Sequence, residues 1–331
     1  MSRTVATACA NIALVKYWGK RDLTLNLPEA GSLSITLDAL RTWTSIELDA
    51  DADADTLILD GRPQSGRPLA RVSAHLDRVR SPDAPRARIR TFNAFPSAAG
   101  LASSASGFAA LSVAACGAYG VEASGAQLSV LARRGSGSAA RSIFGGWVKM
   151  DAGQRADGED ACARPLDIDL ELSAAIAVAT AGEKEVGSTE GMERTRTTSP
   201  YHASWIAKVD EDLRDAEAAL RSADLERLAT IVEGSCLAMH ADAMAARPGI
   251  IYFNGVTLWA LEEVRRMRAE GTPVMFTIDA GPHVVALTPP EHLDAVAARL
   301  AANPAVTRVI TSKVGSGAAL SDAPPEQLDA P

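Results

Sequence analysis

A chain of 331 residues is long enough to bury a large core, and its length favours two lobes over one. Hydrophobic residues make up 47% of the sequence and charged residues 22%, a globular composition that excludes a disordered polymer. The formal net charge of -8 argues against duplex nucleic acid as a partner, because that partner favours a basic surface. A locally basic pocket for a small phosphorylated molecule is still compatible with this charge.

The cysteines are few and far apart, with no CxxC pair and no histidines at metal-ligand spacing; they are Cys9, Cys116, Cys162 and Cys236. This pattern argues against a disulfide scaffold and a zinc site, and it predicts small core residues in a reducing compartment. No apolar run approaches 18 residues, and residues 1–13 lack the basic flank and apolar length of a signal peptide. We therefore expect a cytoplasmic protein with no membrane partner.

The first part of the chain is predicted to form an antiparallel sheet with one wet face. Leu33, Ile35 and Leu37 alternate with polar residues, and Asp60-Gly61 is a turn pair. A helix is predicted over 68–80, where apolar residues recur at helical spacing and proline suits the first turn. The strands predicted in this part cover residues 32–37, 42–48, 56–59 and 89–92.

The rest of the chain is predicted to mix helices with short strands. Residues 153–164 are polar and are expected to form a surface connection, and residues 321–331 are expected to be a frayed tail. Further helices are predicted over 103–118, 127–134, 201–245, 251–269 and 290–301, and further strands over 174–180, 274–278, 284–287 and 306–311. Both element types occur in both halves, which predicts an α+β fold with an N-terminal domain over 1–172 and a C-terminal domain over 173–331.

A segment of small residues, Phe95-Pro-Ser-Ala-Ala-Gly-Leu-Ala-Ser-Ser-Ala-Ser-Gly107, lies between a predicted strand and a predicted helix. Its backbone amides can approach an anion closely, Ser103 and Ser104 can add hydroxyl donors, and the helix contributes the positive end of its dipole. The segment is not a Walker or dinucleotide loop, because GxxxxGK[ST] and GxGxxG are both absent. On composition alone, an Ala/Ser-rich helix packed tightly on a sheet explains it equally well.

The order of the residues carries a more specific resemblance. Pro96-x-x-x-Gly100-Leu101-x-Ser103-Ser104 resembles the ATP phosphate loop of the GHMP kinase superfamily, and residues 93–110 resemble its form in the mevalonate diphosphate decarboxylase (diphosphomevalonate decarboxylase) family. A weaker match covers 184–192. Three further blocks match that family in the same order: Asn11-Ile-Ala-Leu-Val-Lys-Tyr-Trp-Gly-Lys-Arg-Asp22, Arg134-Gly-Ser-Gly-Ser-Ala-Ala-Arg-Ser-Ile-Phe-Gly-Gly146 and Thr277-Ile-Asp-Ala-Gly-Pro282. The resemblance implies a two-lobed GHMP-kinase-like fold with mainly antiparallel sheets and an active site in the cleft between the lobes.

This resemblance implies ATP and Mg2+ as cofactors and assigns the phosphate loop to ATP. Ser104 is also the candidate Mg2+ ligand. A single protein ligand is enough for this proposal, because Mg2+ keeps several of its waters when bound. The ATP-binding residues that the resemblance implies are Pro96, Gly100, Leu101, Ala102, Ser103 and Ser104.

The glycine- and serine-rich stretch 135–142 ends with Arg141 and Ser142. Decarboxylation requires a rigid cation that holds the carboxylate in one orientation, and a guanidinium does so with two parallel hydrogen bonds. An exposed arginine that caps a helix is the ordinary alternative. The resemblance assigns Arg141 to the substrate carboxylate, and Ser136 and Ser138 to the phosphate end and orientation of the substrate.

An aromatic pair between two lysines occupies residues 16–20, which by itself indicates a strand end with snorkelling side chains. The resemblance instead places Lys16 in the active site, in contact with the carboxylate end of the substrate and with the catalytic aspartate. It makes Tyr17 a substrate contact. Trp18 and Lys20 rank lower as candidates.

Asp279 follows an apolar predicted strand and precedes Ala-Gly-Pro, where an aspartate often simply begins a turn. A carboxylate held at a rigid strand end can also act on a hydroxyl, and the resemblance assigns Asp279 as the catalytic aspartate. Ser188 and Thr189 match hydroxyls that bind the distal phosphate of the substrate in the family. An N-cap role before a helix over 190–196 is an equal alternative for both residues.

Together these blocks imply ATP-dependent decarboxylation of mevalonate 5-diphosphate to isopentenyl diphosphate, ADP, phosphate and CO2 by way of 3-phosphorylation, in a homodimer. Three alternatives stay open: a decarboxylase of mevalonate 5-phosphate, a mevalonate 3-kinase without decarboxylation, and a catalytically dead ligand-binding protein of the same fold. The sequence departs from the family where Ala30-Gly31-Ser32 stands for Asn-Ser-Ser, Gly187 for a serine and His283 for an asparagine. The first departure removes polar groups that we expect on the nucleotide side.

Overall fold

The computed structural model describes residues 3–95, 103–179 and 185–329, and its first lobe is built on two long strands, β1 (Arg3–Val15) and β4 (Ser32–Asp49). They pair antiparallel, and β4 then pairs with β8 through its first part and with β7 through its last part. The sheet order is β14-β1-β4-β7-β5-β6, with β8 and β9 beside β4. The other strands here are β5 (Thr56–Leu59), β6 (Arg62–Gln64), β7 (Arg86–Asn93), β8 (Trp147–Met150), β9 (Ala163–Pro165) and β14 (Ala319–Leu320).

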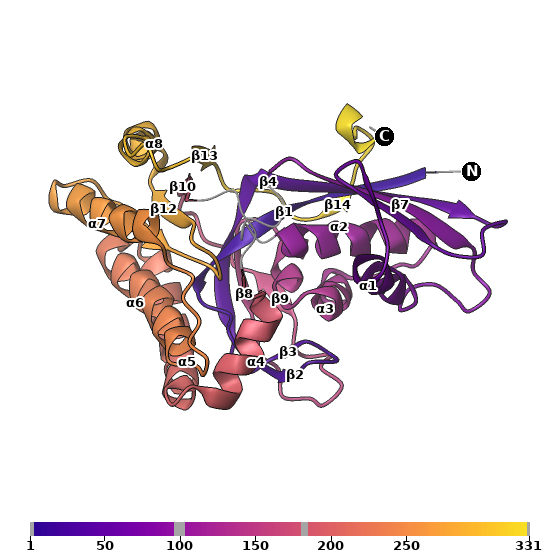
Figure 1. Cartoon of the computed structure of the whole chain (residues 1–331), viewed down its shortest axis with the longest axis horizontal. Coiled ribbons are helices and arrows are strands. Elements are labelled where there is room, and N and C mark those ends of the chain that lie inside the picture. Colours follow the sequence, from indigo (N-terminus) through magenta and orange to yellow (C-terminus); the bar gives the residue numbers. More distant parts are fainter. Residues whose placement is uncertain (1–2, 96–102, 180–184, 330–331) are drawn as a thin grey trace.

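Three helices lie along one side of this sheet in Figure 1: α1 (Arg67–Leu76), α2 (Ser103–Ala118) and α3 (Gly125–Gly135). The central helix, α2, contacts both β1 and β4. Its buried positions include Ala109, Ala110 and Ala114, whose small side chains let the helix lie close to the strands. The short 3-10 helix η1 (Gly137–Ile143) also packs on α2, so the serine-rich stretch after α3 lies beside the phosphate-loop helix.

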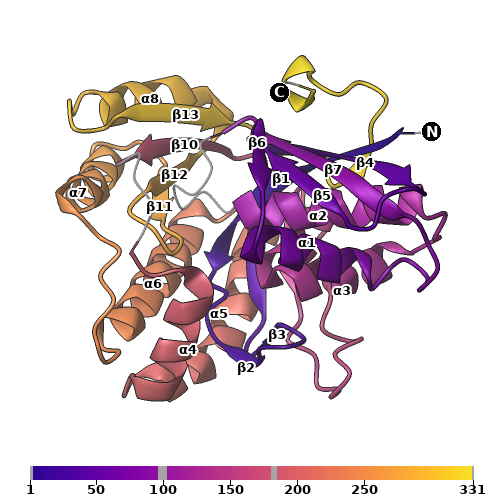
Figure 2. The ribbon, with the colours of Figure 1, turned by 45° about the vertical axis from the view of Figure 1, so that its right-hand side comes forward.

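The second lobe contains a four-stranded antiparallel sheet in the order β11-β12-β10-β13. Figure 2 shows α4 beside the β2–β3 hairpin of the first lobe, and α4 contacts β2. The hairpin strands are β2 (Lys20–Asp22) and β3 (Leu27–Pro28). The elements of the second lobe are β10 (Ser173–Val178), α4 (Ser188–Thr198), α5 (His202–Arg221), α6 (Leu225–Met244), α7 (Gly255–Ala269), β11 (Met275–Thr277), β12 (Val284–Thr288), η2 (Pro290–His292), α8 (Leu293–Ala301) and β13 (Arg308–Ser312). This mixture confirms the predicted α+β fold.

Helix α6 connects the two lobes, because it contacts both β1 and β11. One apolar cluster includes Leu14 of β1, Val232 and Met239 of α6, and Leu287 of β12. Close packing of this kind resists relative movement of the strands. The shared core therefore fixes the end of β1 relative to the end of β11.

Two predicted elements differ from the structure in the second half. The helical stretch 201–245 is two helices, separated where Ala223 has a φ of 52° and Asp224 caps α6 by accepting a hydrogen bond from the Arg227 amide (3.0 Å). The tail is not frayed up to residue 329: Leu328 is buried, and Asp329 forms an ion pair with Arg3 (2.8 Å). The buried Leu328 and the pairing of β14 with β1 hold this segment against the first sheet.

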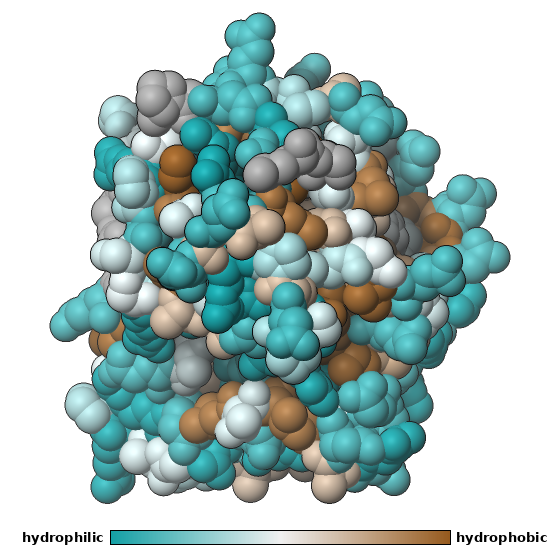
Figure 3. Space-filling model, turned by 90° about the vertical axis from the view of Figure 1, so that its right-hand side faces the viewer, coloured by the Kyte–Doolittle hydropathy of each residue, from teal (hydrophilic) through white to brown (hydrophobic). Residues whose placement is uncertain are grey.

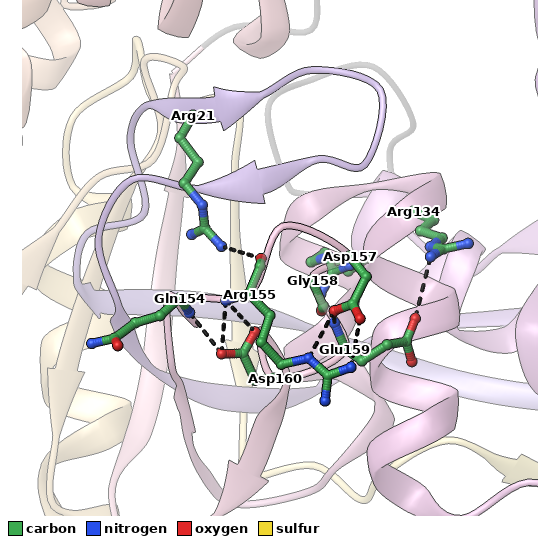
Figure 4. A network of polar contacts seen from close by, with 9 residues as sticks. Arg21, Arg134, Gln154, Arg155, Asp157, Gly158, Glu159 and Asp160 are labelled. Atoms are coloured by element: carbon green, nitrogen blue, oxygen red, sulfur yellow. Dashed lines mark hydrogen bonds and ion pairs between the residues drawn. The ribbon is translucent and has the colours of Figure 1, made fainter.

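The predicted surface connection is a loop, residues 151–162, folded by its own polar groups (Figure 4). Asp160 accepts hydrogen bonds from the backbone amides of Gln154 (2.7 Å) and Arg155 (3.1 Å). Arg21 of β2 donates to a backbone carbonyl of the loop (2.6 Å), and Arg134 at the end of α3 pairs with a glutamate of the loop (3.2 Å). The loop thereby connects the β2–β3 hairpin to α3.

The surface of the first lobe is mainly hydrophilic on the face drawn in Figure 3, and hydrophobic residues are scattered among the polar ones. Among the residues that the structure describes, no helix has both the length and the apolar character needed to span a membrane.

Candidate active site

A cavity of about 800 Å³ opens between the lobes and gathers most of the predicted site residues. Its lining includes nine of them, from segments far apart in the sequence: Tyr17, Ser103, Ser104, Ser136, Ser138, Arg141, Ser188, Thr189 and Asp279. Lys16 lies behind this lining. The predicted ATP-binding residues Pro96, Gly100, Leu101 and Ala102 lie outside the described residues.

Lys16 and Asp279 form an ion pair at one end of the cavity. Lys16 directly follows β1, Asp279 lies just beyond β11, and the Lys16 Nζ–Asp279 Oδ1 distance is 2.7 Å. The lysine side chain is 1% exposed, whereas the aspartate side chain is 27% exposed. A buried ammonium needs such a partner, because an unpaired charge in the interior is costly. The carboxylate therefore faces the cavity, and the lysine supports it from behind.

Arg141 is buried in the wall of the same cavity, so the alternative of an exposed helix cap is wrong. Its Nε donates to Asn11 Oδ1 (3.0 Å) and its Nη1 donates to Ser32 Oγ (2.8 Å). Burial lowers the pKa of Arg141 to about 10, and the charge of Asp279 opposes that shift. The guanidinium stays charged at neutral pH, and within the described residues its Nη2 has no hydrogen-bonding partner.

Tyr17 lies against the guanidinium of Arg141, with 5.6 Å between its ring centroid and the guanidinium carbon. Gly137 packs on the phenol so closely that an added Cβ would lie 2.1 Å from Tyr17 Oη, which explains the glycine. Burial raises the pKa of Tyr17 above its ordinary value, so the phenol is neutral. Its buried hydroxyl has no partner among the described residues, and the side chain lines the cavity.

A chain of hydroxyl groups joins the first turn of α2 to the start of η1. Ser104 Oγ lies 3.2 Å from Ser136 Oγ, which lies 3.3 Å from Ser138 Oγ. The three groups can each donate or accept. They form a polar wall next to the predicted phosphate loop.

A second part of the cavity wall is cationic and lies beside this chain of hydroxyls, since Arg71 donates to the Gly135 carbonyl (3.1 Å) next to Ser136. Lys20, Arg67, Arg71 and Arg134 line it, although the protein as a whole is acidic. Lys20 was ranked low from the sequence and the three arginines were not singled out as site residues. The signal that could have found two of them is the i,i+4 spacing of Arg67 and Arg71 in the first turns of a helix, which places both on one face.

Lys20 is the best-defined member of this wall. Its Nζ donates to Asn26 Oδ1 (2.7 Å) and to Thr189 Oγ1 (3.3 Å). Burial, together with the charge of Arg71, lowers the pKa of Lys20 to about 8. An anion bound here would stabilise the protonated form.

Ser188 and Thr189 begin α4, but neither of them is its N-cap. The cap is Gly187, and it makes no side-chain capping bond, so the N-cap alternative is wrong for both hydroxyl residues. Both line the cavity at the N-terminus of the helix. The backbone amides of a first helical turn favour an anion at this position.

The family departures at residues 30–32 have structural explanations. An added Cβ at Gly31 would lie 2.8 Å from a leucine of α5 and 2.9 Å from a backbone carbonyl of β8, so a side chain does not fit. Neither Ala30 nor Gly31 lines the cavity, whereas the retained Ser32 holds Arg141. The effect of this departure on nucleotide binding stays a prediction. His283 is buried and accepts a hydrogen bond from the Ala179 amide (3.1 Å).

Two family models match this chain along most of its length. The diphosphomevalonate decarboxylase-like N-terminal domain matches residues 8–163, and the mevalonate 5-diphosphate decarboxylase C-terminal domain matches residues 174–316. The chain belongs to the diphosphomevalonate decarboxylase family. The resemblance seen in the sequence is thereby confirmed.

Members of the diphosphomevalonate decarboxylase family from fungi and animals align with most of the chain. The diphosphomevalonate decarboxylase of Aspergillus fumigatus is 42% identical over 306 residues, which cover 86% of this chain and 76% of that protein. The human diphosphomevalonate decarboxylase is 37% identical over 314 residues, which cover 87% of this chain and 77% of that protein.

Solved structures of the same family share the fold. The mevalonate diphosphate decarboxylase of Staphylococcus aureus has a TM-score of 0.91 and 34% identity, covering 97% of this chain and 98% of that chain. A structure described as MDDEF in complex with MVAPP, AMPPCP and magnesium has a TM-score of 0.90 and 37% identity, covering 97% of this chain and 99% of that chain.

Proposed function

We propose that this chain catalyses the ATP-dependent decarboxylation of mevalonate 5-diphosphate to isopentenyl diphosphate, ADP, phosphate and CO2. The observation that carries the proposal is the Lys16–Asp279 pair, which opens onto the same cavity as Arg141 and the first turn of α2. The names of the relatives support the reaction, and the ligands described for MDDEF support the two substrates and the metal.

The reaction requires that a tertiary hydroxide become a good leaving group. Transfer of the terminal phosphoryl group of ATP to the 3-hydroxyl achieves this and releases ADP. The bond between carbon 3 and the phosphate oxygen then breaks, the bond to the carboxylate breaks to release CO2, and that electron pair forms the double bond. The protein must therefore orient one hydroxyl and one carboxylate of the same molecule.

In our proposal three residues share this task at the buried end of the cavity. Asp279 would orient or deprotonate the hydroxyl, and Lys16 would hold Asp279 from behind through the 2.7 Å contact. Arg141 would hold the substrate carboxylate, for which its Nη2 is available. Its fixed Nε and Nη1 would keep the guanidinium in one plane, and Tyr17 would offer its hydroxyl to the substrate.

The cationic wall would bind the diphosphate of the substrate and the phosphates of ATP. Lys20, Ser188 and Thr189 would bind the distal phosphate of the substrate, and Ser136 and Ser138 would orient the substrate; all five line the same cavity. The hydroxyls of Ser103 and Ser104 at the start of the described part of α2 would, together with the arginines that line the same cavity, bind the phosphates of ATP. Mg2+ would neutralise phosphate charge, and Ser104 is its proposed protein ligand.

A coupled assay tests the function directly. ADP release is followed with mevalonate, mevalonate 5-phosphate and mevalonate 5-diphosphate, and CO2 is measured in parallel. We expect both products, in equal amounts, with the diphosphate. ADP without CO2 would instead indicate a 3-kinase, turnover of the monophosphate alone would indicate the shorter substrate, and no ADP with any of the three would contradict an enzymatic role.

Three further proposals follow from the sequence, and the homodimer among them is what the resemblance implies. The N-terminal domain would cover residues 1–172 and the C-terminal domain residues 173–331, the chain would form a homodimer, and the protein would be cytoplasmic. Light scattering on the purified protein tests the dimer, because a mass near 34.6 kDa would be that of a single chain. Fractionation of cells tests the location.

A further inference from the structure

One face of α6 lies against the ends of both strands that carry the Lys16–Asp279 pair. Ser235, Cys236 and His240 are at most 2% exposed. Cys236 and His240 are four positions apart and share a face of the helix, and Ser235 directly precedes Cys236. The helix contacts β1 from the first lobe and β11 from the second. These three polar side chains therefore stand where the two lobes meet.

Each of the three makes a hydrogen bond to the backbone beside the pair. Ser235 Oγ accepts from the Lys16 amide (3.1 Å). The Ile278 amide donates to Cys236 Sγ (3.2 Å), and the Ile278 carbonyl accepts from His240 Nε2 (3.3 Å). All three bonds are buried.

The backbone of Ile278 depends on these side chains because strand pairing has already ended. The ladder between β11 and β12 stops at the pair Thr277 and Val285. A buried amide and carbonyl must still find partners, and α6 supplies both. The next residue is Asp279, whose short side chain has two rotatable bonds and follows its backbone closely.

Both groups that hold Ile278 are neutral. Burial, together with the charge of Lys16, lowers the pKa of His240 to about 3, and burial raises the pKa of Cys236 to about 11. Because the Ile278 carbonyl can only accept, the imidazole carries its proton on Nε2. The contacts therefore do not change over the pH range in which an assay is run.

We infer that Ser235, Cys236 and His240 are positioning residues that set where Asp279 and Lys16 meet and how the carboxylate faces the cavity. The inference rests on the proposed function, which gives this pair its role. Lys16 has a long side chain that can follow a small shift, but Asp279 cannot. A displacement of about 1 Å at a reacting group can reduce turnover about a hundredfold, so the bonds to Ile278 matter most.

The test compares matched variants of α6 in the coupled assay. Cys236→Ala and His240→Leu remove the bonds that the two side chains make to Ile278, including a longer one from the Cys236 thiol to the Ile278 carbonyl (3.7 Å). Cys236→Ser and His240→Gln keep an acceptor for the amide and donors for the carbonyl. We expect kcat to fall about tenfold or more in the first two, KM for both substrates to stay within about twofold, and most of kcat to return in the second two.

The control is Leu228→Ala in the first turn of the same helix, a fully buried core residue more than two turns from Cys236 and with no hydrogen bond to Lys16 or Ile278. We expect it to lower Tm and leave kcat unchanged when all variants are assayed well below the lowest Tm. If Cys236→Ala and His240→Leu lower Tm but not kcat, or if the control loses as much kcat, the inference is overturned while the proposed function stands.

The failure of the proposed function and the failure of a variant to fold can both be told apart from failure of the inference. A parent protein that releases no ADP overturns the proposed function and the inference with it. If His240→Leu does not fold, Ser235→Ala removes a single oxygen and carries the same test at the Lys16 end. Its kcat should fall severalfold at unchanged KM, and an unchanged kcat overturns the inference.

Discussion

The two ends of the cavity use charge in opposite ways. At the buried end, each cation is already held inside the protein: Lys16 by Asp279, and Arg141 by Asn11 and Ser32. At the other end, Lys20 and three arginines line the wall and outnumber the carboxylates there. The first arrangement fixes geometry, and the second attracts an anion. We therefore expect changes at the buried end to act on kcat and changes at the cationic end to act on KM and on its dependence on pH and salt.

The strongest test of this division is Asp279→Asn. The substitution keeps the size of the side chain and removes its charge and its basicity, and we expect kcat to fall about a thousandfold. Substrate binding, measured by calorimetry, should change little because the phosphate contacts lie at the other end. Turnover within tenfold of the parent would remove Asp279 from the mechanism.

Arg141→Lys should give the next largest loss, about a hundredfold in kcat. An ammonium keeps the charge but cannot hold Asn11 and Ser32 while presenting a flat edge to the substrate carboxylate. Arg133→Lys is the matched control, because Arg133 is also fully buried in the first lobe but does not line the cavity. It should lower Tm without lowering kcat. Near-normal kinetics of Arg141→Lys would contradict the proposed carboxylate clamp.

The cationic end should respond differently. Lys20→Met should raise KM for the phosphorylated substrate about tenfold, equivalent to about 1.4 kcal/mol, with a smaller change in kcat. In the parent, KM should rise as the pH passes about 8, because the unliganded ammonium loses its proton there. The variant should lack that rise.

Arg71→Gln sharpens the same point. The charge of Arg71 contributes to the lowered pKa of Lys20, so its removal should move the rise in KM to higher pH. The measurement is KM from pH 6.5 to about 9.5 for the parent, Lys20→Met and Arg71→Gln, each at two salt concentrations, and the pH at which KM rises is compared. A KM profile of Arg71→Gln that coincides with that of the parent would exclude this coupling.

The contrast between the two ends also separates what the sequence could reveal from what it could not. Residues of the buried end lie in contiguous motifs, and the family resemblance assigned Lys16, Arg141 and Asp279 to one site that the structure brings together. The groups that hold them come from elsewhere: Ser32 is 109 positions from Arg141, and Ser235 is 219 positions from Lys16. Hydrophobic periodicity and motif spacing act over a few residues and cannot predict contacts between residues so far apart in the sequence.

The full length of β4 was also not predicted from the sequence. The sequence predicted two strands, 32–37 from the alternation of apolar residues and 42–48 from its β-forming residues, and Asp38 and Arg41 lie between them. In the structure β4 continues through them: the amides of Asp38 and Ala39 donate to the Lys313 carbonyl (3.0 Å) and to Ser312 Oγ (3.0 Å), and Leu37 and Leu40 are buried. Packing on both faces of the strand outweighed the local polar signal.

The smallest effect we expect comes from a cluster behind the cationic end, where His202 of α5 lies between Asp242 of α6 (2.7 Å) and Glu29 of the first lobe (2.8 Å). The cluster supports the loop that carries Lys20, since an added Cβ at Gly19 would lie 2.4 Å from the Glu29 carboxylate. Burial lowers the pKa of His202, but the hydrogen bonds and charges of Asp242 and Glu29 outweigh it and raise the pKa above its ordinary value.

A histidine whose pKa is raised on folding stabilises the folded state fully below its unfolded pKa, about 6.5, and loses that contribution as the pH rises through the folded pKa. The Tm of the parent should therefore exceed that of His202→Gln by a few degrees at pH 6, and the difference should shrink as the pH is raised towards about 9. Calorimetry across this range checks the sign. A Tm difference that grows with pH would mean that the imidazole is neutral between its two carboxylates. The kcat of His202→Gln at pH 7 should stay close to that of the parent, because the cluster touches neither Lys16 nor Asp279.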